Sequence, residues 1–301
     1  MRVLVTGGGG FIGARLVEAL RERNDDVVVT GRSEGPLRKR LGGGVTCVAW
    51  DPVSGPPPAA ALANVDAVVN LAGEPVASGR WTKAKKARIR ESRVLGTRHL
   101  VAGMLAAEPR PKVLVNASAI GYYGDRKNQW VYEESPPGRD FLAEACEAWE
   151  AEAWKARSKV RTAVVRFGIV LGKGGGAYPQ MSFPFRIFAG GTISQGYAWM
   201  SWIHEADVTG ILLHCLDKEV AGVFNATAPN PVSNGEFSHT LAQVLHRPCF
   251  AMVPALALRL IKGEFAKVIT ASARVKPLRT EASGYTFRFP RIREALVDLE
   301  R

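Results

Sequence analysis

The residues best suited to chemistry are three glycines near the start of the chain, at positions 7, 10 and 13. They follow an apolar run typical of a buried strand (3–5) and precede apolar residues at helical spacing (14–20). The first glycine permits a tight turn, the second lets a pyrophosphate approach the backbone, and the third lets the helix pack closely on the strand. The N-terminus of a helix then offers free N–H groups to phosphates. This strand, turn and helix predict a dinucleotide site rather than an unoccupied turn, with cofactor-binding residues Gly7, Gly10, Phe11, Ile12 and Gly13.

The end of the second predicted strand (27–30) distinguishes between the two nicotinamide cofactors. An NAD site places Asp or Glu there to accept hydrogen bonds from the ribose 2′-hydroxyl, whereas an arginine suits a 2′-phosphate. This chain has Gly31 and Arg32 at that point. The guanidinium offers a fork of donors to a phosphate, so the sequence favours NADP(H). The alternative is that Arg32 is a surface residue in a basic loop.

A family resemblance rests on two stretches, T-G-G-G-G-F-I-G at 6–13 and N-L-A-G at 70–73. They resemble the extended short-chain dehydrogenase/reductase superfamily, in particular its sugar-nucleotide epimerase and dehydratase side. Over nearly its full length the chain is most similar to the atypical branch labelled putative epimerase or cell-division-inhibitor-like. The resemblance implies that the N-L-A-G strand end lies along the adenosine half of the cofactor. It gives as further cofactor-binding candidates Leu71, Ala72, Gly73, Arg93 and Arg166. Arg93 could alternatively be a solvated charge on a helix, and Arg166 could be part of a salt bridge at a strand end.

Hydroxyl groups gather after the predicted strand 113–118. Ser118 and the run Tyr122-Tyr123-Gly124-Asp125 resemble the family's S-S-x-x-V-Y-G-D stretch, in which a strand-end hydroxyl binds the reacting oxygen. Alignment on Tyr123 places Ala119 at the usual hydroxyl position, so the hydroxyl is either shifted by one residue or absent. The catalytic candidates are Ser118, Tyr122 and Tyr123.

The family's proton donor is the tyrosine of a helical Tyr-x-x-x-Lys, and here the expected helix (140–157) has Leu142 and Cys146 at those positions. A literal Tyr-x-x-x-Lys does occur at 123–127, but its Gly-Asp pair is typical of a turn, so we interpret it as a chance occurrence. Two hypotheses follow. The protein is an oxidoreductase or epimerase that transfers hydride, or it is an NADP(H)-binding regulator or redox sensor without the usual catalytic pair.

These residues require a doubly wound parallel sheet, the Rossmann fold, with a smaller C-terminal α/β lobe for the substrate. We expect the cofactor domain to comprise 1–172 and 207–230, and the substrate lobe 173–206 and 231–301. A small-molecule substrate would lie between them, lined by Glu74, Phe185 and Trp202. The two aromatic rings could equally belong to the core of the lobe. A monomer or homodimer is expected.

The composition excludes several other classes. The chain of 301 residues is 47% hydrophobic and has no apolar run near the ~20 residues of a membrane span. With no signal peptide pattern, we expect a cytoplasmic protein without a membrane partner. The four cysteines and five histidines lack metal-ligand spacing, so no metal is expected. The net charge of +12 fits a solvated face or an anionic ligand better than nucleic acid, because the basic stretches lack interleaved aromatic residues.

Overall fold

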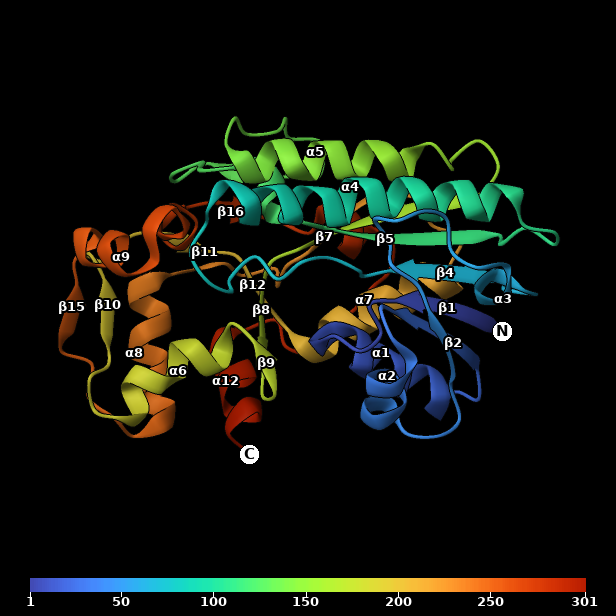
Figure 1. Cartoon of the computed structure of the whole chain (residues 1–301). Helices are drawn as coiled ribbons and strands as arrows, with labels where there is room; N and C mark the ends of the chain where they lie inside the picture. The colour runs from blue at the N-terminus through green and yellow to red at the C-terminus, as the bar shows by residue number, and fades with distance from the viewer.

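A seven-stranded, wholly parallel sheet forms the centre of the computed structural model, which describes residues 1–301 (Figure 1). The strand order is β13-β7-β5-β4-β1-β2-β3, so the chain runs outward from β1 in one direction and from β4 in the other. Ligands of such sheets bind at this switch point, at the carboxyl ends of the strands. The predicted doubly wound sheet is confirmed. Its strands are β1 (Arg2–Thr6), β2 (Asp26–Gly31), β3 (Thr46–Ala49), β4 (Ala67–Asn70), β5 (Val113–Ala119), β7 (Arg161–Phe167) and β13 (Gly222–Ala226).

Helices cover both faces of the sheet (Figure 1). One face carries α1 (Phe11–Glu22), α2 (Glu34–Leu41) and α7 (Glu205–Asp217). The other face carries α3 (Ala59–Leu62), α4 (Lys83–Ala106) and α5 (Phe141–Trp154). No helix in the structure has both the length and the apolar character needed to cross a bilayer.

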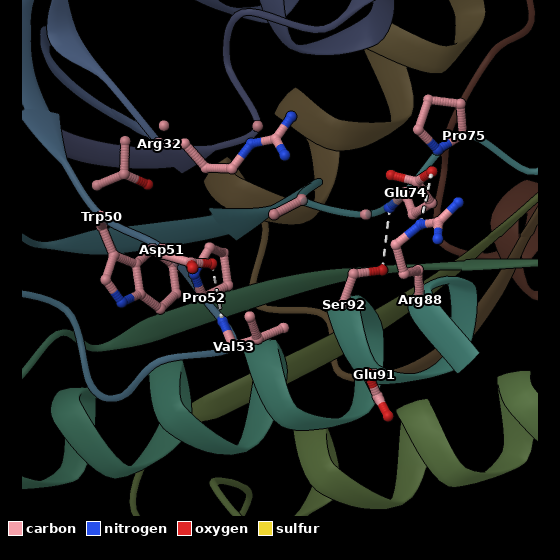
Figure 2. Close-up of a pocket in the computed structure, with 15 residues that line it drawn as sticks. Arg32, Trp50, Asp51, Pro52, Val53, Glu74, Pro75, Arg88, Glu91 and Ser92 are labelled. Atoms are coloured by element: carbon pink, nitrogen blue, oxygen red, sulfur yellow. Dashed lines mark hydrogen bonds and ion pairs between the residues drawn. The ribbon is translucent and has the colours of Figure 1, made fainter. Parts of the chain in front are cut away.

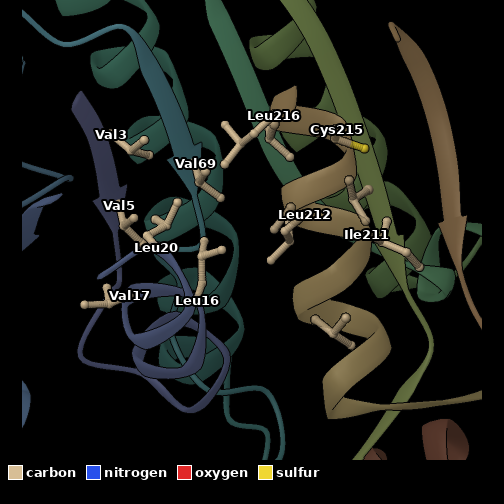
Figure 3. Packing of buried hydrophobic residues seen from close by; sticks show 14 of the residues in the cluster. Val3, Val5, Leu16, Val17, Leu20, Val69, Ile211, Leu212, Cys215 and Leu216 are labelled. Atoms are coloured by element: carbon tan, nitrogen blue, oxygen red, sulfur yellow. The ribbon is translucent and has the colours of Figure 1, made fainter. Parts of the chain in front are cut away.

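Successive side chains of each strand point to opposite faces of the sheet, so every strand contributes to two hydrophobic cores, one on each face. Val3 and Val5 of β1 pack against α1 and α7, while Leu4 between them joins the cluster beneath α4. Figure 3 shows the first cluster, in which Leu16 and Leu20 of α1 meet the sheet. The apolar run that predicted a buried strand is therefore buried on both sides, as in other parallel sheets.

The second half of the chain adds a smaller lobe beside the carboxyl edge of the sheet (Figure 1). Its strands are β6 (Trp130–Val131), β8 (Ile169–Gly172), β9 (Gly175–Gly176), β10 (Gly191–Ile193), β11 (Trp199–Met200), β12 (Trp202–His204), β14 (Val232–Ser233), β15 (Ala251–Val253) and β16 (Arg274–Val275). Its helices are η1 (Ile120–Tyr123), α6 (Tyr178–Arg186), α8 (Asn234–Leu245), α9 (Ala255–Lys262), η2 (Gly263–Phe265), α10 (Ala266–Thr270), α11 (Leu278–Ala282) and α12 (Ile292–Glu300). The residue boundaries proposed for the two domains stay a prediction.

The core of this lobe contains two rings that the sequence analysis assigned to the substrate. Phe185 and Trp202 are both buried in one cluster with Phe237 and Leu296. The indole N–H of Trp202 donates to the backbone oxygen of Asn230. The structure therefore places both rings in the packed interior, which was the alternative interpretation, and not at a substrate surface.

Candidate functional site

The glycine-rich turn between β1 and α1 is packed as closely as its spacing predicts. Gly7 has a φ of +68°, and a Cβ there would lie 2.8 Å from the backbone oxygen of Leu71. A Cβ on Gly13 would lie 2.3 Å from the oxygen of Gly7. Gly10 is the N-cap of α1, so the first N–H groups of the helix face the carboxyl edge of the sheet. These positions leave no room for a larger residue and present donors to an anion.

A cavity of about 290 Å³ lies at the switch point, beside this turn (Figure 2). Residues from the ends of four strands (β1, β2, β3 and β4) and from α4 form its wall. Five of the predicted cofactor residues are brought together there: Gly7, Gly31, Arg32, Ala72 and Gly73. The sequence analysis missed other lining residues, namely Asp51 and Pro52 after β3, and Arg88 and Ser92 on α4. Asp51 could have been found from the sequence, because it follows an apolar strand pattern. The pattern of α4, in contrast, does not show which of its many basic residues faces the cavity.

Glu74 lies in this cavity and not in the substrate cleft where we had expected it. Its carboxylate accepts a hydrogen bond from Lys85 Nζ at 2.7 Å, and its Oε1 is 3.7 Å from Arg88 Nε. The pKa of Glu74 is lowered, mainly by the hydrogen bond from Lys85, with smaller effects of the Arg88 and Arg32 charges. The carboxylate is thus ionised at neutral pH and neutralised chiefly by a buried lysine.

Two guanidinium groups in this cavity keep donors free for a ligand. Arg32 extends from the end of β2 towards Glu74 on the facing wall (Figure 2), with no carboxylate within 4.0 Å. Arg88 is well exposed, and its only carboxylate neighbour is Glu74. Glu74 is already bound by Lys85, and two further carboxylates, Asp51 and Glu91, line the cavity, so anion binding there would rest on the free donors of these two guanidinium groups. An anion with several oxygens fits this arrangement.

Arg93 of α4 supplies a third guanidinium group, which lies beside Gly73 and Glu74, after the end of β4. Its Nη1 donates to the backbone oxygens of Glu74 and Ile89, both at 3.0 Å, and its Cζ lies 5.2 Å from the centre of the Trp149 ring. A Cβ on Gly73 would be 3.0 Å from this Cζ. Burial lowers the pKa of Arg93, and no carboxylate pairs with it. A ligand phosphate or ribose would satisfy its remaining donors, and that role stays a prediction.

The structure corrects three other assigned roles, those of Ser118, Tyr123 and Arg166. Arg166 is buried and forms a bidentate pair with Glu150, with Nη2 2.7 Å from Oε2 and Nε 2.8 Å from Oε1. The hydroxyl of Ser118 donates to the same carboxylate at 2.6 Å. The hydroxyl of Tyr123 donates to Asn225 at 2.7 Å and accepts from Arg166. All three groups are buried and satisfied within the protein, and none lines the cavity at the switch point.

The two tyrosines differ in their surroundings. Burial raises the pKa of Tyr123 to about 12, and its ring is wholly inaccessible. Tyr122 is half-buried, with the Arg166 guanidinium stacked 3.4 Å from its ring centre, and burial raises its pKa as well. Neither phenol has the lowered pKa or the cavity position of a proton donor. The literal Tyr-x-x-x-Lys does not lie on one helix, since Lys127 lies beyond η1 in a left-handed turn and pairs with Asp125.

The usual catalytic positions on α5 are occupied as the sequence indicated. Leu142 lies in the first turn of the helix and lines a second cavity. Cys146, one turn later, is buried, and desolvation raises the pKa of its thiol to about 11. A thiol with this pKa stays protonated near neutrality and is a poor nucleophile.

The second cavity has a volume of about 760 Å³ and lies between the N-terminus of α5, η1 and the segment around α10. Aromatic and aliphatic groups form much of its wall, and charged groups complete it. The apolar groups include Trp81, Ile120, Phe141, Leu142, Ile169, Trp199 and Val268. The charged groups include Lys86, Arg139, Glu144, Glu264 and Lys267. Trp81 and Trp199 form part of the aromatic wall of this cavity, whereas Phe185 and Trp202 lie in the core of the lobe.

Comparison with known proteins gives matches over the whole chain. Residues 3–227 match the model of the NAD dependent epimerase/dehydratase family, and residues 253–299 match a domain of unknown function, DUF1731. The chloroplastic SDR39U1 homolog of Arabidopsis thaliana, named an epimerase family protein, is 40% identical over 98% of this chain and 86% of its own length. The human epimerase family protein SDR39U1 is 36% identical over 99% of both chains.

Solved structures match over the same length. The crystal structure of human SDR39U1 (isoform 2) with NADPH aligns with a TM-score of 0.88 at 35% identity, covering 99% of each chain. UDP-glucuronic acid 4-epimerase from Bacillus cereus, in complex with UDP-glucuronic acid and NAD, aligns with a TM-score of 0.80 at 15% identity, covering 100% of this chain and 98% of the other. At that identity the second match shows a common fold only.

Proposed function

The chain belongs to the NAD dependent epimerase/dehydratase family, and we propose that it binds NADP(H) in the switch-point cavity and transfers hydride to or from a small carbonyl or sugar-nucleotide-like substrate. The observation that carries the cofactor choice is Arg32, which follows Gly31 at the end of β2 and has no carboxylate partner. An NAD site would have an acidic residue there. The human relative was crystallised with NADPH, which supports the same choice.

Different residues of this chain would hold different parts of the cofactor. The turn from Gly7 to Gly13 and the N-terminus of α1 would hold the pyrophosphate, because a Cβ would fill this cradle. Arg32 and Arg88 would hold the 2′-phosphate. The strand end 71–73 would lie along the adenosine half, and Arg93 would hold the phosphate or ribose nearer the nicotinamide. When bound, the cofactor supplies or accepts the hydride.

The second cavity is the proposed substrate site. Its indole, phenyl and aliphatic groups would exclude water, and its charged side chains would orient a polar substrate. The proton that accompanies hydride transfer would not come from Ser118 or Tyr123, which are held in the buried network. It would come from solvent that reaches this cavity.

Calorimetric titration with NADPH and NADH tests the cofactor proposal. We expect NADPH to bind more tightly, and Arg32→Ala to weaken NADPH binding about tenfold or more while leaving NADH binding unchanged, because a charge-assisted phosphate contact is lost. Arg40→Ala is the matched control, since Arg40 is an exposed arginine outside the cavity. Equal or tighter binding of NADH would refute the proposal.

A second function is favoured by one observation, the presence of Leu142 and Cys146 where a catalytic tyrosine and lysine are usual. The protein would then be an NADP(H)-binding regulator. Thiol-based redox sensing fits less well, since the Cys146 thiol is buried and has a raised pKa. Oxidation of NADPH should be followed across a panel of carbonyl compounds and sugar nucleotides. Turnover of any substrate supports the enzyme, whereas tight NADPH binding without turnover supports the regulator.

A further inference from the structure

A group of large apolar side chains is exposed at the far end of the C-terminal lobe, on β15 and α9 (Figure 1). On β15 and its flank, Phe250 is 75% exposed and Met252 60%. On α9, Leu256, Leu260 and Ile261 are 67%, 69% and 65% exposed. We call these five residues the end surface. Single exposed apolar residues are ordinary, but five on adjoining elements indicate a partner.

The direction of these side chains follows from the local structure. Phe250 and Met252 alternate with half-buried Ala251 and Val253, so one face of β15 packs on the lobe and the other faces outward. No residue of α9 is buried. Leu256 and Leu260 are one turn apart and Ile261 adjoins them, so the helix directs an apolar stripe away from the protein. A surface helix normally directs that stripe into the core.

The surface continues onto the segment after α6. Ile187 and Phe188 are 56% and 58% exposed, and the N–H of Phe250 donates to Gly190 two residues further on. The guanidinium of Arg247 lies 4.6 Å from the centre of the Phe188 ring. The apolar groups are therefore bordered by a cation at this edge.

The charged residues around the end surface are mostly cations. Residues 246–270 contain four cations, Arg247, Arg259, Lys262 and Lys267, and a single carboxylate, Glu264. Glu264 is bound by Lys86 at 2.9 Å, whereas none of the four cations has a carboxylate within 4.0 Å. A second copy of this chain, which carries a net charge of +12, would bring the same cationic border towards this one. The occupant should be apolar and anionic together.

We propose that the end surface docks on an anionic lipid bilayer. Its five apolar side chains would enter the boundary between headgroups and acyl chains, and Arg247, Arg259 and Lys262 would contact anionic headgroups. This arrangement lays the protein on a membrane without spanning it. The proposal revises our sequence-based expectation that no membrane is bound, and it does not depend on the proposed function.

Co-sedimentation of the full chain with lipid vesicles tests the proposal. We expect binding to vesicles of phosphatidylcholine mixed with phosphatidylserine, weaker binding to phosphatidylcholine alone, and loss of binding at high salt. The double variant Leu256→Glu, Leu260→Glu should bind at least about tenfold more weakly, because it removes two leucines that would enter the bilayer. Neutralising Arg259 and Lys262 to Gln should weaken binding to the anionic vesicles about fivefold per charge.

The control is Leu278→Glu, which alters an exposed leucine of α11 outside the end surface and should leave vesicle binding unchanged. NADPH titration of each variant shows whether the cofactor domain is intact, so a failure here is separable from a failure of the proposed function. Absence of vesicle binding, or binding unaffected by the leucine variant, would overturn the proposal. A dimer in solution that the leucine variant dissociates, without vesicle binding, would assign the surface to self-association and overturn it too.

Discussion

A methyl group added at Gly175 should destabilise the protein through its effect on Phe11. The ring of Phe11, the first residue of α1, packs on the backbone of the β8–β9 hairpin. An added Cβ at Gly175 would lie 2.5 Å from Phe11 Cδ2, and one at Gly172 would lie 2.2 Å from Phe11 Cζ. Real Cβ atoms do not approach carbon so closely, so either the ring or the hairpin must shift.

The size of the effect follows from overpacking. Inserting a methyl group where there is no space costs about 1–3 kcal/mol. For a chain of this length, each kcal/mol lowers the melting temperature by about 2 °C, so Gly175→Ala should lower it by about 2–6 °C. In a Phe11→Ala background the ring is absent and only the Cβ of residue 11, 3.1 Å from the added methyl group, remains close, so the cost should fall to the lower end of that range or below it. The two changes should therefore be coupled by about 1 kcal/mol or more.

Denaturation of the four proteins of this cycle, by heat and by urea, measures that coupling. Gly174→Ala is the matched control, because a Cβ there has only Arg15 Nη2 nearby, at 3.9 Å. NADPH titration of Gly175→Ala should also show weaker binding, since a displaced Phe11 moves the N–H groups that we propose hold the pyrophosphate. If Gly175→Ala destabilises the protein equally with and without the ring, the packing argument is refuted.

Other predictions concern the charged groups. Arg88→Ala should weaken NADPH binding about tenfold without affecting NADH, whereas Arg90→Ala, on the same helix but outside the cavity, should change neither affinity in calorimetry. Glu150→Ala should cost about 3–5 kcal/mol in urea denaturation, because it leaves a buried guanidinium unpaired; a loss under 1 kcal/mol would contradict the network. Because the pKa of Glu74 is lowered from 4.5, chiefly by Lys85, its stabilisation is present above pH 4.5 and is lost as the pH falls through the lowered pKa. Glu74→Gln should flatten that part of a stability–pH curve, and an unchanged curve would count against the ion pair.

The features that the sequence predicted well are those set by short-range physics. A buried strand, a glycine turn and an amphipathic helix follow one another within 20 residues, and each restricts the backbone strongly. Gly31-Arg32 likewise stands directly at a strand end. The resemblance to the extended short-chain dehydrogenase/reductase superfamily is confirmed by the match to the epimerase/dehydratase family, which spans residues 3–227 and so includes these stretches. Local patterns were sufficient because the cofactor cavity is built from consecutive strand ends.

The assignments that failed depended on contacts between distant segments. Ser118 and Arg166 belong to neighbouring strands, and their side chains meet Glu150 of α5, a partner that no spacing in the sequence could select. Phe185 and Trp202 lie in a segment without regular periodicity, where a core ring and a cavity ring have the same pattern. Arg88 is one of many basic residues on α4, and only the fold distinguishes it.

The two halves of the site differ in a way that constrains any mechanism. The cofactor half keeps a close-packed glycine turn and two guanidinium groups, of which Arg32 has no carboxylate within 4.0 Å and Arg88 has only Glu74, at 3.7 Å. In the other half, a side chain on α5 that could donate a proton is replaced by Leu142, and the nearby hydroxyls are held by Glu150 and Asn225. Burial of these hydroxyls raises the cost of ionising them, and each would have to leave its Glu150 or Asn225 acceptor before it could contact a substrate. A carbonyl reduction catalysed here would therefore need the proton for the carbonyl oxygen, next to the carbon that receives the hydride, from a source other than Ser118 or Tyr123.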